Sequence, residues 1–367
     1  MSAVLSGNKG EWSEIYVFLR LLAVGKLFAA DENLNKMDSV FYDVLKIFRE
    51  EEHCKLEFNY NKAENTVSVV NTSTSVPVLT MPADKFKQEA DYLYDRIVNN
   101  GGNGAFYIEE TEKFLNSIQI SKIKAASNQK EDIVIKLHDL NNGCDRIQGF
   151  SIKSKLGSPS TLINAGATTN FIYKVHGPMN ETICRDFNQL NTLNTFKKKF
   201  DYLKSKNCDV AYCGMESSMF QNNLRLMDSN LPEITGYLVL MHYRDGYNNV
   251  REAISRLTEI NPLGFDYSDG QPFYEYKFKR LLTESALGMT PSKTWDGTAN
   301  ATGGYIIVKE NGEVLCYHLY NRNEFENYLL NNTKFETAST SRHKFGTIYQ
   351  DKGDYYLKLN LQVRFIK

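Results

Sequence analysis

The chain of 367 residues is long enough for two or three domains, or for one elaborated domain. Its composition is that of a globular protein, with 42% apolar and 24% charged residues and only 8 prolines, which excludes extensive disorder. The 43 basic and 44 acidic residues give a formal net charge of −1, so the chain lacks a global basic signature, although duplex DNA binding requires only a local cluster of cations.

The sequence also indicates in which cellular compartment the protein is expected. The first ten residues contain no apolar signal region, and the apolar run 15–24 is interrupted by Arg20 and is too short to span a bilayer. The six cysteines form no C-x-x-C pair, and Cys208 and Cys213 lack the neighbours that a zinc site needs. Free thiols fit a reducing compartment. We therefore expect a cytoplasmic protein with no membrane partner.

The apolar spacing predicts a largely buried helix over residues 11–30, with Glu11 and Glu14 on one flank of its first turns. A carboxylate on a buried helix is costly unless it is paired or bound to a metal. A helix N-terminus also favours an acid through its dipole. Glu14 is therefore either a candidate metal ligand or an acid that the helix dipole favours.

Further elements are predicted before residue 120. They are a helix over 38–50, a hairpin of 55–60 with 66–70, a helix from Pro82 to Asn99, and a short helix over 109–117.

The segment 131–159 is the part of the sequence on which the functional hypothesis depends. Two runs rich in β-branched and aromatic residues, 132–138 and 147–153, flank Asn142-Gly143, a strong hairpin signal. Symmetric pairing about that dipeptide places Asp132 opposite Lys153. Alternation in strands then divides the residues between a core face and a second face. The core face has Ile133, Ile135, Leu137, Phe150 and Ile152, and the second has Asp132, Ser151, Lys153 and Lys155.

A carboxylate and an ammonium on adjacent strands are what a metal-dependent phosphodiesterase needs. The acid holds a divalent cation, while the lysine orients the attacking water and stabilises charge on the phosphorus. The alternative interpretation is a cross-strand salt bridge on a solvated face of the sheet. His138 with Asn141 or Asn142 faintly suggests an HNH-type nuclease, but that layout leaves Asp132 and Lys153 unexplained.

The second half of the chain is predicted to mix helices and strands. Ser158-Pro159 is typical of a helix start, here through Ala167, and residues 233–243 have the pattern of a central strand. The remaining predictions are helices over 181–206, 248–259, 273–286 and 322–330, a hairpin of 305–309 with 313–320, and closing strands over 345–350 and 354–366.

Several segments resemble a known family. Asp132 followed by Ser151-Ile152-Lys153 resembles the PD-(D/E)xK nuclease motif, with serine where a second acid is usual. The surrounding sequence is similar to the HpaII family of type II restriction endonucleases, and the resemblance covers nearly the whole chain. Its segments are Gly10-Glu11-Trp12-Ser13-Glu14, Gly149-Phe150-Ser151-Ile152-Lys153-Ser154, Asn321-Arg322-Asn323-Glu324-Phe325 and Ser341-Arg342-His343.

The resemblance implies Mg²⁺-dependent hydrolysis of double-stranded DNA at CCGG, with 5′-phosphate and 3′-hydroxyl ends. Asp132 would bind Mg²⁺, Lys153 would position the attacking water, and Ser151 would offer a hydroxyl, or nothing, in place of an acid. We nominate Glu14 as the missing metal ligand, because side-chain parity places Gln148 with the core residues.

The polar segment around Ser341, Arg342 and Lys344 is the best candidate for DNA contact, since arginine reads guanine in the major groove. A solvent-exposed loop is the alternative. A palindromic target is most simply met by a homodimer.

These inferences predict a mixed α/β fold, with a restriction-endonuclease-like central mixed sheet flanked by helices and a β-rich C-terminal part. We expect an N-terminal helical and hairpin layer over 1–125, a nuclease core over 126–260 and a DNA-recognition part over 261–367. The rival hypotheses are a catalytically silent DNA-binding or assembly protein on a nuclease scaffold, and a repair or mobile-element nuclease.

Overall fold

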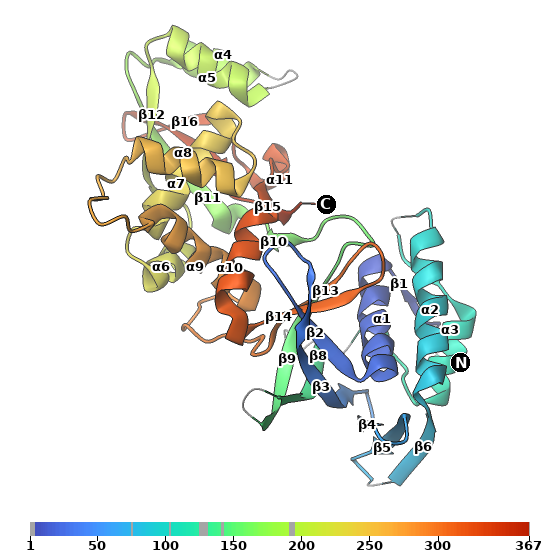
Figure 1. The fold of residues 1–367 in the computed structure, drawn as a ribbon. Coiled ribbons are helices and arrows are strands. Elements are labelled where there is room, and N and C mark those ends of the chain that lie inside the picture. The colour runs from blue at the N-terminus through green and yellow to red at the C-terminus, as the bar shows by residue number, and fades with distance from the viewer. Residues whose placement is uncertain are drawn as a thin grey trace. The chain divides into compact units, whose positions relative to one another are not determined.

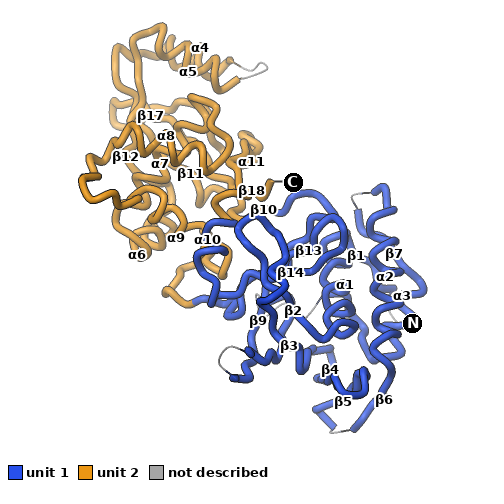
Figure 2. The backbone as a smooth tube through the Cα atoms, in the orientation of Figure 1, with its two compact units in different colours: residues 1–160, 299–328, 367 blue, residues 161–298, 329–366 orange. Residues whose placement is uncertain are grey.

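The computed structural model describes residues 4–74, 76–102, 104–124, 131–140, 143–190 and 195–366. The chain forms two compact units (Figure 2). Unit 1 consists of Met1–Ser160, Ala299–Tyr328 and Lys367, and unit 2 of Thr161–Thr298 and Leu329–Ile366. Helices and strands occur throughout both units, so the predicted mixed α/β fold is confirmed.

A mixed sheet forms the centre of unit 1 (Figure 1). Its order among the described residues is β2-β14-β13-β9-β8-β3-β4-β5-β6, and an additional pairing of β2 with β3 joins six of these strands into a ring. The β9–β13 and β2–β14 pairs are parallel and the others are antiparallel. The bounds are β2 Lys26–Ala30, β3 Lys36–Glu50, β4 Lys55–Asn61, β5 Thr66–Asn71, β6 Val76–Pro82, β8 Ile133–Asp139, β9 Cys144–Ser154, β13 Gly304–Val308 and β14 Val314–His318.

Helices α1 (Lys9–Val24), α2 (Ala83–Asn99) and α3 (Glu109–Ser117) lie together beside this sheet (Figure 1). The small β1–β7 pair (Ser6–Gly7 and Phe106–Tyr107) lies at the start of α1. Asn8 caps α1 in a reciprocal capping box with Glu11, which satisfies backbone N–H groups that the first turn leaves unpaired. Most α1 residues between Trp12 and Leu22 are buried in the core of unit 1, with Glu14 and Arg20 as the exceptions.

The predictions for α2, α3 and the β4–β5 hairpin are confirmed, whereas two others near the N-terminus need correction. The helix predicted over 11–30 ends at Val24, because Gly25 adopts a left-handed φ of 66° and the chain continues as β2. The helix predicted over 38–50 is wrong. That segment is β3, whose backbone pairs with β2, β4 and β8 and whose side chains Tyr42, Val44 and Ile47 are buried in the core.

Unit 2 contains two small sheets, ordered β12-β11-β17-β16 and β10-β18-β15 in its described residues. Its strands are β10 Thr161–Ile163, β11 Asn170–His176, β12 Asp209–Met215, β15 Thr333–Phe335, β16 Ile348–Asp351, β17 Asp354–Asn360 and β18 Val363–Phe365. Its helices are α4 Glu181–Gln189, α5 Thr195–Ser205, α6 Ser218–Met227, α7 Leu231–Asp245, α8 Val250–Ile260, α9 Phe273–Leu287 and α11 Thr340–His343, and α10 Arg322–Asn331 begins in unit 1.

Two predictions within unit 2 are wrong. Residues 233–243, predicted as a strand, lie inside helix α7. This helix is buried almost all round, so its apolar residues do not form the one-sided stripe that distinguishes a helix from a buried strand. The helix predicted from Ser158 to Ala167 is replaced by β10, which pairs with β18, and by a short 3₁₀ turn over Ala167–Thr169. The helix predicted over 181–206 is present as α4 and α5.

The compact units divide the chain differently from the three predicted ranges. The sheet of unit 1 takes strands from 1–125, from 126–260 and from 261–367, because β13 and β14 pair with β9 and β2. The C-terminal range does contain β13 to β18, together with helices. The functions assigned to these three ranges, a nuclease core over 126–260 and DNA recognition over 261–367 among them, stay predictions.

Two glycines with nearly equal left-handed φ angles give a matched test of the junction after α1. Gly25 (φ 66°) lies against Tyr60, whose Cε1 atom would be 2.1 Å from an added Cβ, whereas an added Cβ at Gly143 (φ 65°) meets no atom within 4 Å. Gly143→Ala should lower the free energy of unfolding by about 1 kcal/mol through φ alone. Gly25→Ala should lower it further, because the Tyr60 ring must also move. Urea unfolding of both variants measures this difference, and equal losses would contradict the close packing at Gly25.

Candidate active site

The Asp132 carboxylate is held at the start of β8 by the neighbouring strand β9. Its backbone N–H donates to the Phe150 carbonyl (2.9 Å), which extends the β8–β9 ladder by one bond. Its Oδ2 atom accepts hydrogen bonds from the Ser151 hydroxyl (3.1 Å) and from the Ile152 backbone N–H (2.6 Å). Two donors on one strand therefore fix the orientation of this half-buried acid.

The register of the hairpin differs from the predicted one by two residues. Ile133 pairs with Phe150, so Asp132 lies level with Ser151 and not with Lys153. Because side chains alternate with a period of two, this shift keeps Asp132, Ser151 and Lys153 on one face, and the predicted core residues of β8 and β9 are buried. The turn was predicted at Asn142-Gly143, and Asn142 lies outside the described residues.

Lys153 joins the site through Ser151. Its Nζ donates to the Ser151 hydroxyl (3.2 Å) and lies 5.4 Å from the centre of the Tyr305 ring. Tyr305 is on β13, in register with Ser151, and its phenol pKa is raised far above the ordinary value by burial and, secondarily, by Asp132. Ser151 thus connects the acid to the lysine. No local sequence pattern pointed to Tyr305, because its strand lies far along the chain from β9 and pairs with it by a long-range contact.

Glu14 on α1 is the second acid of the site. Burial raises the pKa of its carboxyl to about 8, the charges of Asp132 and Glu11 add to that effect, and Lys124 and Lys153 oppose it. Its Oε2 atom is buried and accepts no hydrogen bond from any residue that the structure describes. The hydroxyls of the adjacent Ser13 and of Ser154 are hydrogen-bonded (2.8 Å), which ties this turn of α1 to the end of β9.

Two cavities of unit 1 share Glu14 in their walls. The first, of about 450 Å³, is also lined by Asp132, Glu131 and Arg49. The second, of about 280 Å³, is also lined by Lys153 and by the residues that follow β9. Glu14 therefore lies between the acid side and the lysine side of the site.

The donor set suits a magnesium ion that also binds substrate. In the parts of the chain that are described, no group of three or more His, Cys, Asp or Glu side chains is placed to hold a metal. Magnesium commonly uses one or two protein carboxylates and completes its shell with waters and phosphate oxygens. Two neighbouring carboxylates, one with an unpaired buried oxygen, match that requirement.

Other candidate residues are engaged elsewhere. His138 Nδ1 lies 2.8 Å from an Asp145 oxygen, and Asn141 and Asn142 of the HNH hypothesis fall outside the described residues. Gln148, which the sequence disfavoured as a metal ligand, contacts His318 Nε2 at 2.8 Å through its Oε1 atom.

No described helix has the length and apolar character needed to cross a membrane.

The predicted DNA-contacting residues are exposed on unit 2. Ser341 and Arg342 are on α11, and Lys344 follows it with a left-handed φ of 53°. The loop is held from beneath by the buried Lys199 ammonium, which donates to the Gly346 carbonyl (2.6 Å), and by the Asn170 amide, which donates to the His343 carbonyl (3.0 Å). The backbone is thus fixed while these side chains are left accessible.

Comparison with known proteins decides the class of this site. A family model described as "HpaII restriction endonuclease" matches residues 8–365. The chain is 40% identical to the type II restriction enzyme HpaII of Haemophilus parainfluenzae, over the full length of both chains. The chain belongs to the HpaII restriction endonuclease family. No solved structure matches it.

Family membership makes the chain a type II site-specific deoxyribonuclease that acts on DNA, as the sequence resemblance implied. It favours this class over the silent DNA-binding protein and over the repair or mobile-element nuclease. The comparison assigns no roles to Asp132, Ser151, Lys153 and Glu14.

The raised pKa of Glu14 predicts how stability depends on pH in the metal-free protein. Its pKa is about 8 when folded, against an ordinary 4.5, so between these values the unfolded chain loses a proton that the folded chain keeps. Stability therefore falls as pH rises from about 4.5 to about 8. Glu14→Gln should remove this fall in stability, because glutamine does not titrate. The variant should therefore be more stable than the native metal-free protein at pH 8 by on the order of 3 kcal/mol, with little difference at pH 4.5.

Urea unfolding at both pH values measures this effect. Glu64→Gln, at an exposed glutamate, serves as the control and should show no such difference. If Glu14→Gln changed stability equally at both pH values, the buried, partly protonated state of Glu14 would be ruled out.

Proposed function

We propose that the chain hydrolyses double-stranded DNA at CCGG in a Mg²⁺-dependent reaction that leaves 5′-phosphate ends. The observation that carries this proposal is the hydrogen-bonded series Lys153–Ser151–Asp132, with the unpaired carboxylate of Glu14 beside it. The CCGG target is taken from the family resemblance.

Asp132 and Glu14 are the residues that would hold Mg²⁺. When bound, the cation supplies charge for the phosphate oxygens and lowers the pKa of a coordinated water. The hydrogen bonds to Asp132 use only its Oδ2 atom, and Glu14 Oε2 has no partner among described residues, so both side chains keep oxygens for a ligand. Glu14 would exchange its proton for the metal, because its pKa near 8 reflects burial next to another carboxylate.

Lys153 would orient the attacking water and stabilise charge on the phosphorus. Its ammonium retains donors beyond the one given to Ser151, and the Tyr305 ring limits the directions in which it can lie. Ser151 replaces the usual acid by a hydroxyl that receives a hydrogen bond from Lys153 and gives one to Asp132. It therefore sets the spacing of the two groups without adding a negative charge.

Recognition is proposed for the exposed residues Ser341, Arg342 and Lys344. Arg342 has the two-donor geometry that reads guanine O6 and N7, and Lys344 suits a backbone phosphate. A palindromic target is read most simply by two copies of the chain related by a two-fold axis. We therefore propose a homodimer on DNA.

Lys153→Ala should abolish site-specific cleavage while leaving DNA binding. Removal of one charge-stabilising donor costs on the order of 100-fold or more in rate. Plasmid digestion with Mg²⁺ measures cleavage, and gel retention without Mg²⁺ measures binding. Lys136→Ala, which removes a lysine paired with Asp145 on the same hairpin, should cut normally. Normal cutting by Lys153→Ala would remove Lys153 from the site.

Arg342→Ala should weaken binding to a CCGG duplex more than binding to a scrambled duplex. Loss of a two-donor base contact costs about 1–3 kcal/mol of discrimination, or roughly 5- to 150-fold. Arg185→Ala, at an exposed arginine on α4, is the matched control and should leave the ratio of the two affinities unchanged. An equal, uniform loss on both duplexes would show that Arg342 contacts only phosphate.

A further inference from the structure

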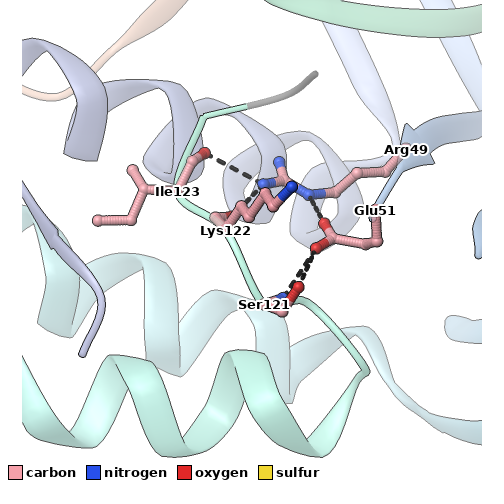
Figure 3. Close-up of polar contacts among 5 residues, drawn as sticks. All are labelled: Arg49, Glu51, Ser121, Lys122 and Ile123. Carbon is pink, nitrogen blue, oxygen red and sulfur yellow. Dashed lines mark hydrogen bonds and ion pairs between the residues drawn. The ribbon is translucent and has the colours of Figure 1, made fainter. Parts of the chain in front are cut away.

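Arg49 and Glu51, at the end of β3, form a buried ion pair (Figure 3). Arg49 Nε and Glu51 Oε1 are 2.7 Å apart, and the two side chains are only 8% and 3% exposed. Burying two charges costs several kcal/mol of solvation, so such a pair adds little net stability unless its remaining polar groups are also bonded. In this pair those remaining groups are bonded to a neighbouring segment of the chain, which the pair therefore holds in place.

Both partners bind the same short segment, Ser121 to Ile123 (Figure 3). Arg49 Nη2 donates to the carbonyls of Lys122 and Ile123, the latter at 3.1 Å. Glu51 Oε2 accepts from the Ser121 backbone N–H (2.9 Å) and from the Ser121 hydroxyl (2.7 Å). We call these two residues and their bonds the Arg49–Glu51 clamp.

The clamp sets the position of the next residue, Lys124. Ile123 is buried in the core of unit 1, where its Cδ1 lies 3.1 Å from the position of a Cβ on Gly7, just before α1. The chain is thus held by β3 on one side and packed against the start of α1 on the other, up to Ile123. The side chain of the next residue, Lys124, is exposed. Arg49, which donates to the Ile123 carbonyl, lines the same cavity as Glu14 and Asp132, so Lys124 directly follows a residue that is bound to the wall of that cavity.

We propose that Lys124 contacts the phosphate backbone of DNA at the cleavage site and that the Arg49–Glu51 clamp positions it there. This inference rests on the proposed role of Asp132, Glu14 and Lys153. An exposed ammonium near a cavity that two carboxylates line offsets their repulsion of an approaching phosphate, and phosphate contacts set the position of DNA on a protein. Lys124 is a contact residue, whereas Arg49 and Glu51 are positioning residues.

The first test compares three lysine variants in single-turnover cleavage of a CCGG duplex with Mg²⁺. Lys124→Ala should reduce the rate about 10- to 100-fold, and Lys124→Arg should recover most of it, because the charge is restored. Lys122→Ala is the matched control, because Lys122 is a neighbouring exposed lysine whose ammonium lies 3.4 Å from a Glu52 oxygen. The Lys122→Ala variant should cut normally. A normal rate for Lys124→Ala would overturn the proposal.

The second test asks whether the clamp acts through Lys124. Glu51→Gln should lower the rate in the same direction, and the double variant with Lys124→Ala should be no slower than Lys124→Ala alone. A general structural defect would instead multiply the two losses and would overturn the positioning role. If Glu51→Gln folds poorly in a melting experiment, Ser121→Ala replaces it, because this variant keeps both charges and removes one hydrogen bond. The double variant of Ser121→Ala with Lys124→Ala should likewise be no slower than Lys124→Ala alone.

Parallel measurement of Lys153→Ala separates failure of this inference from failure of the proposed function. If Lys153→Ala is inactive and Lys124→Ala is normal, only the role of Lys124 is overturned. If Lys153→Ala itself cuts normally, the proposed site falls and the inference falls with it.

Discussion

The register of β8 against β9 is the constraint on which the proposed site depends. It places Asp132 level with Ser151, so that the serine hydroxyl and the next backbone N–H both donate to one carboxylate oxygen. The same register leaves Lys153 two residues further along β9, on the same face and within hydrogen-bond distance of Ser151. A slip by a single residue would turn Ser151 and Lys153 to the opposite face and would separate the acid from the lysine.

A second requirement is a buried carboxylate that the fold itself leaves unsatisfied. Glu14 is held on a helix that is tied to β9 through Ser13 and Ser154, and it lies close enough to Asp132 for repulsion to raise its pKa. A cation bound here would relieve both the repulsion and the burial cost, which supports the proposal that Glu14 is a metal ligand. Under this proposal the serine at position 151 fits the pattern, because Glu14 of α1 would supply the acid that is missing from β9.

Sequence reasoning reached this site in part, because strand alternation and the cost of burying an acid are local properties. They placed Asp132, Ser151 and Lys153 on one face and singled out Glu14, although the predicted pairing was displaced by two residues. Periodicity failed over 38–50 and 233–243, since a strand paired on both sides and a helix buried all round have similar apolar runs. Tyr305 and the Arg49–Glu51 clamp were missed, because both depend on contacts between segments that lie far apart in the sequence.

The central claim is that Glu14 and Asp132 share one cation next to Lys153. The most direct measurement is the anomalous scattering of Mn²⁺, used in place of Mg²⁺, in crystals of the protein with an uncleaved CCGG duplex. Our account predicts a manganese peak bonded to carboxylate oxygens of both Glu14 and Asp132 and to a DNA phosphate. A peak that contacts neither carboxylate, with DNA bound and Lys153 directed away from the phosphate, would contradict it.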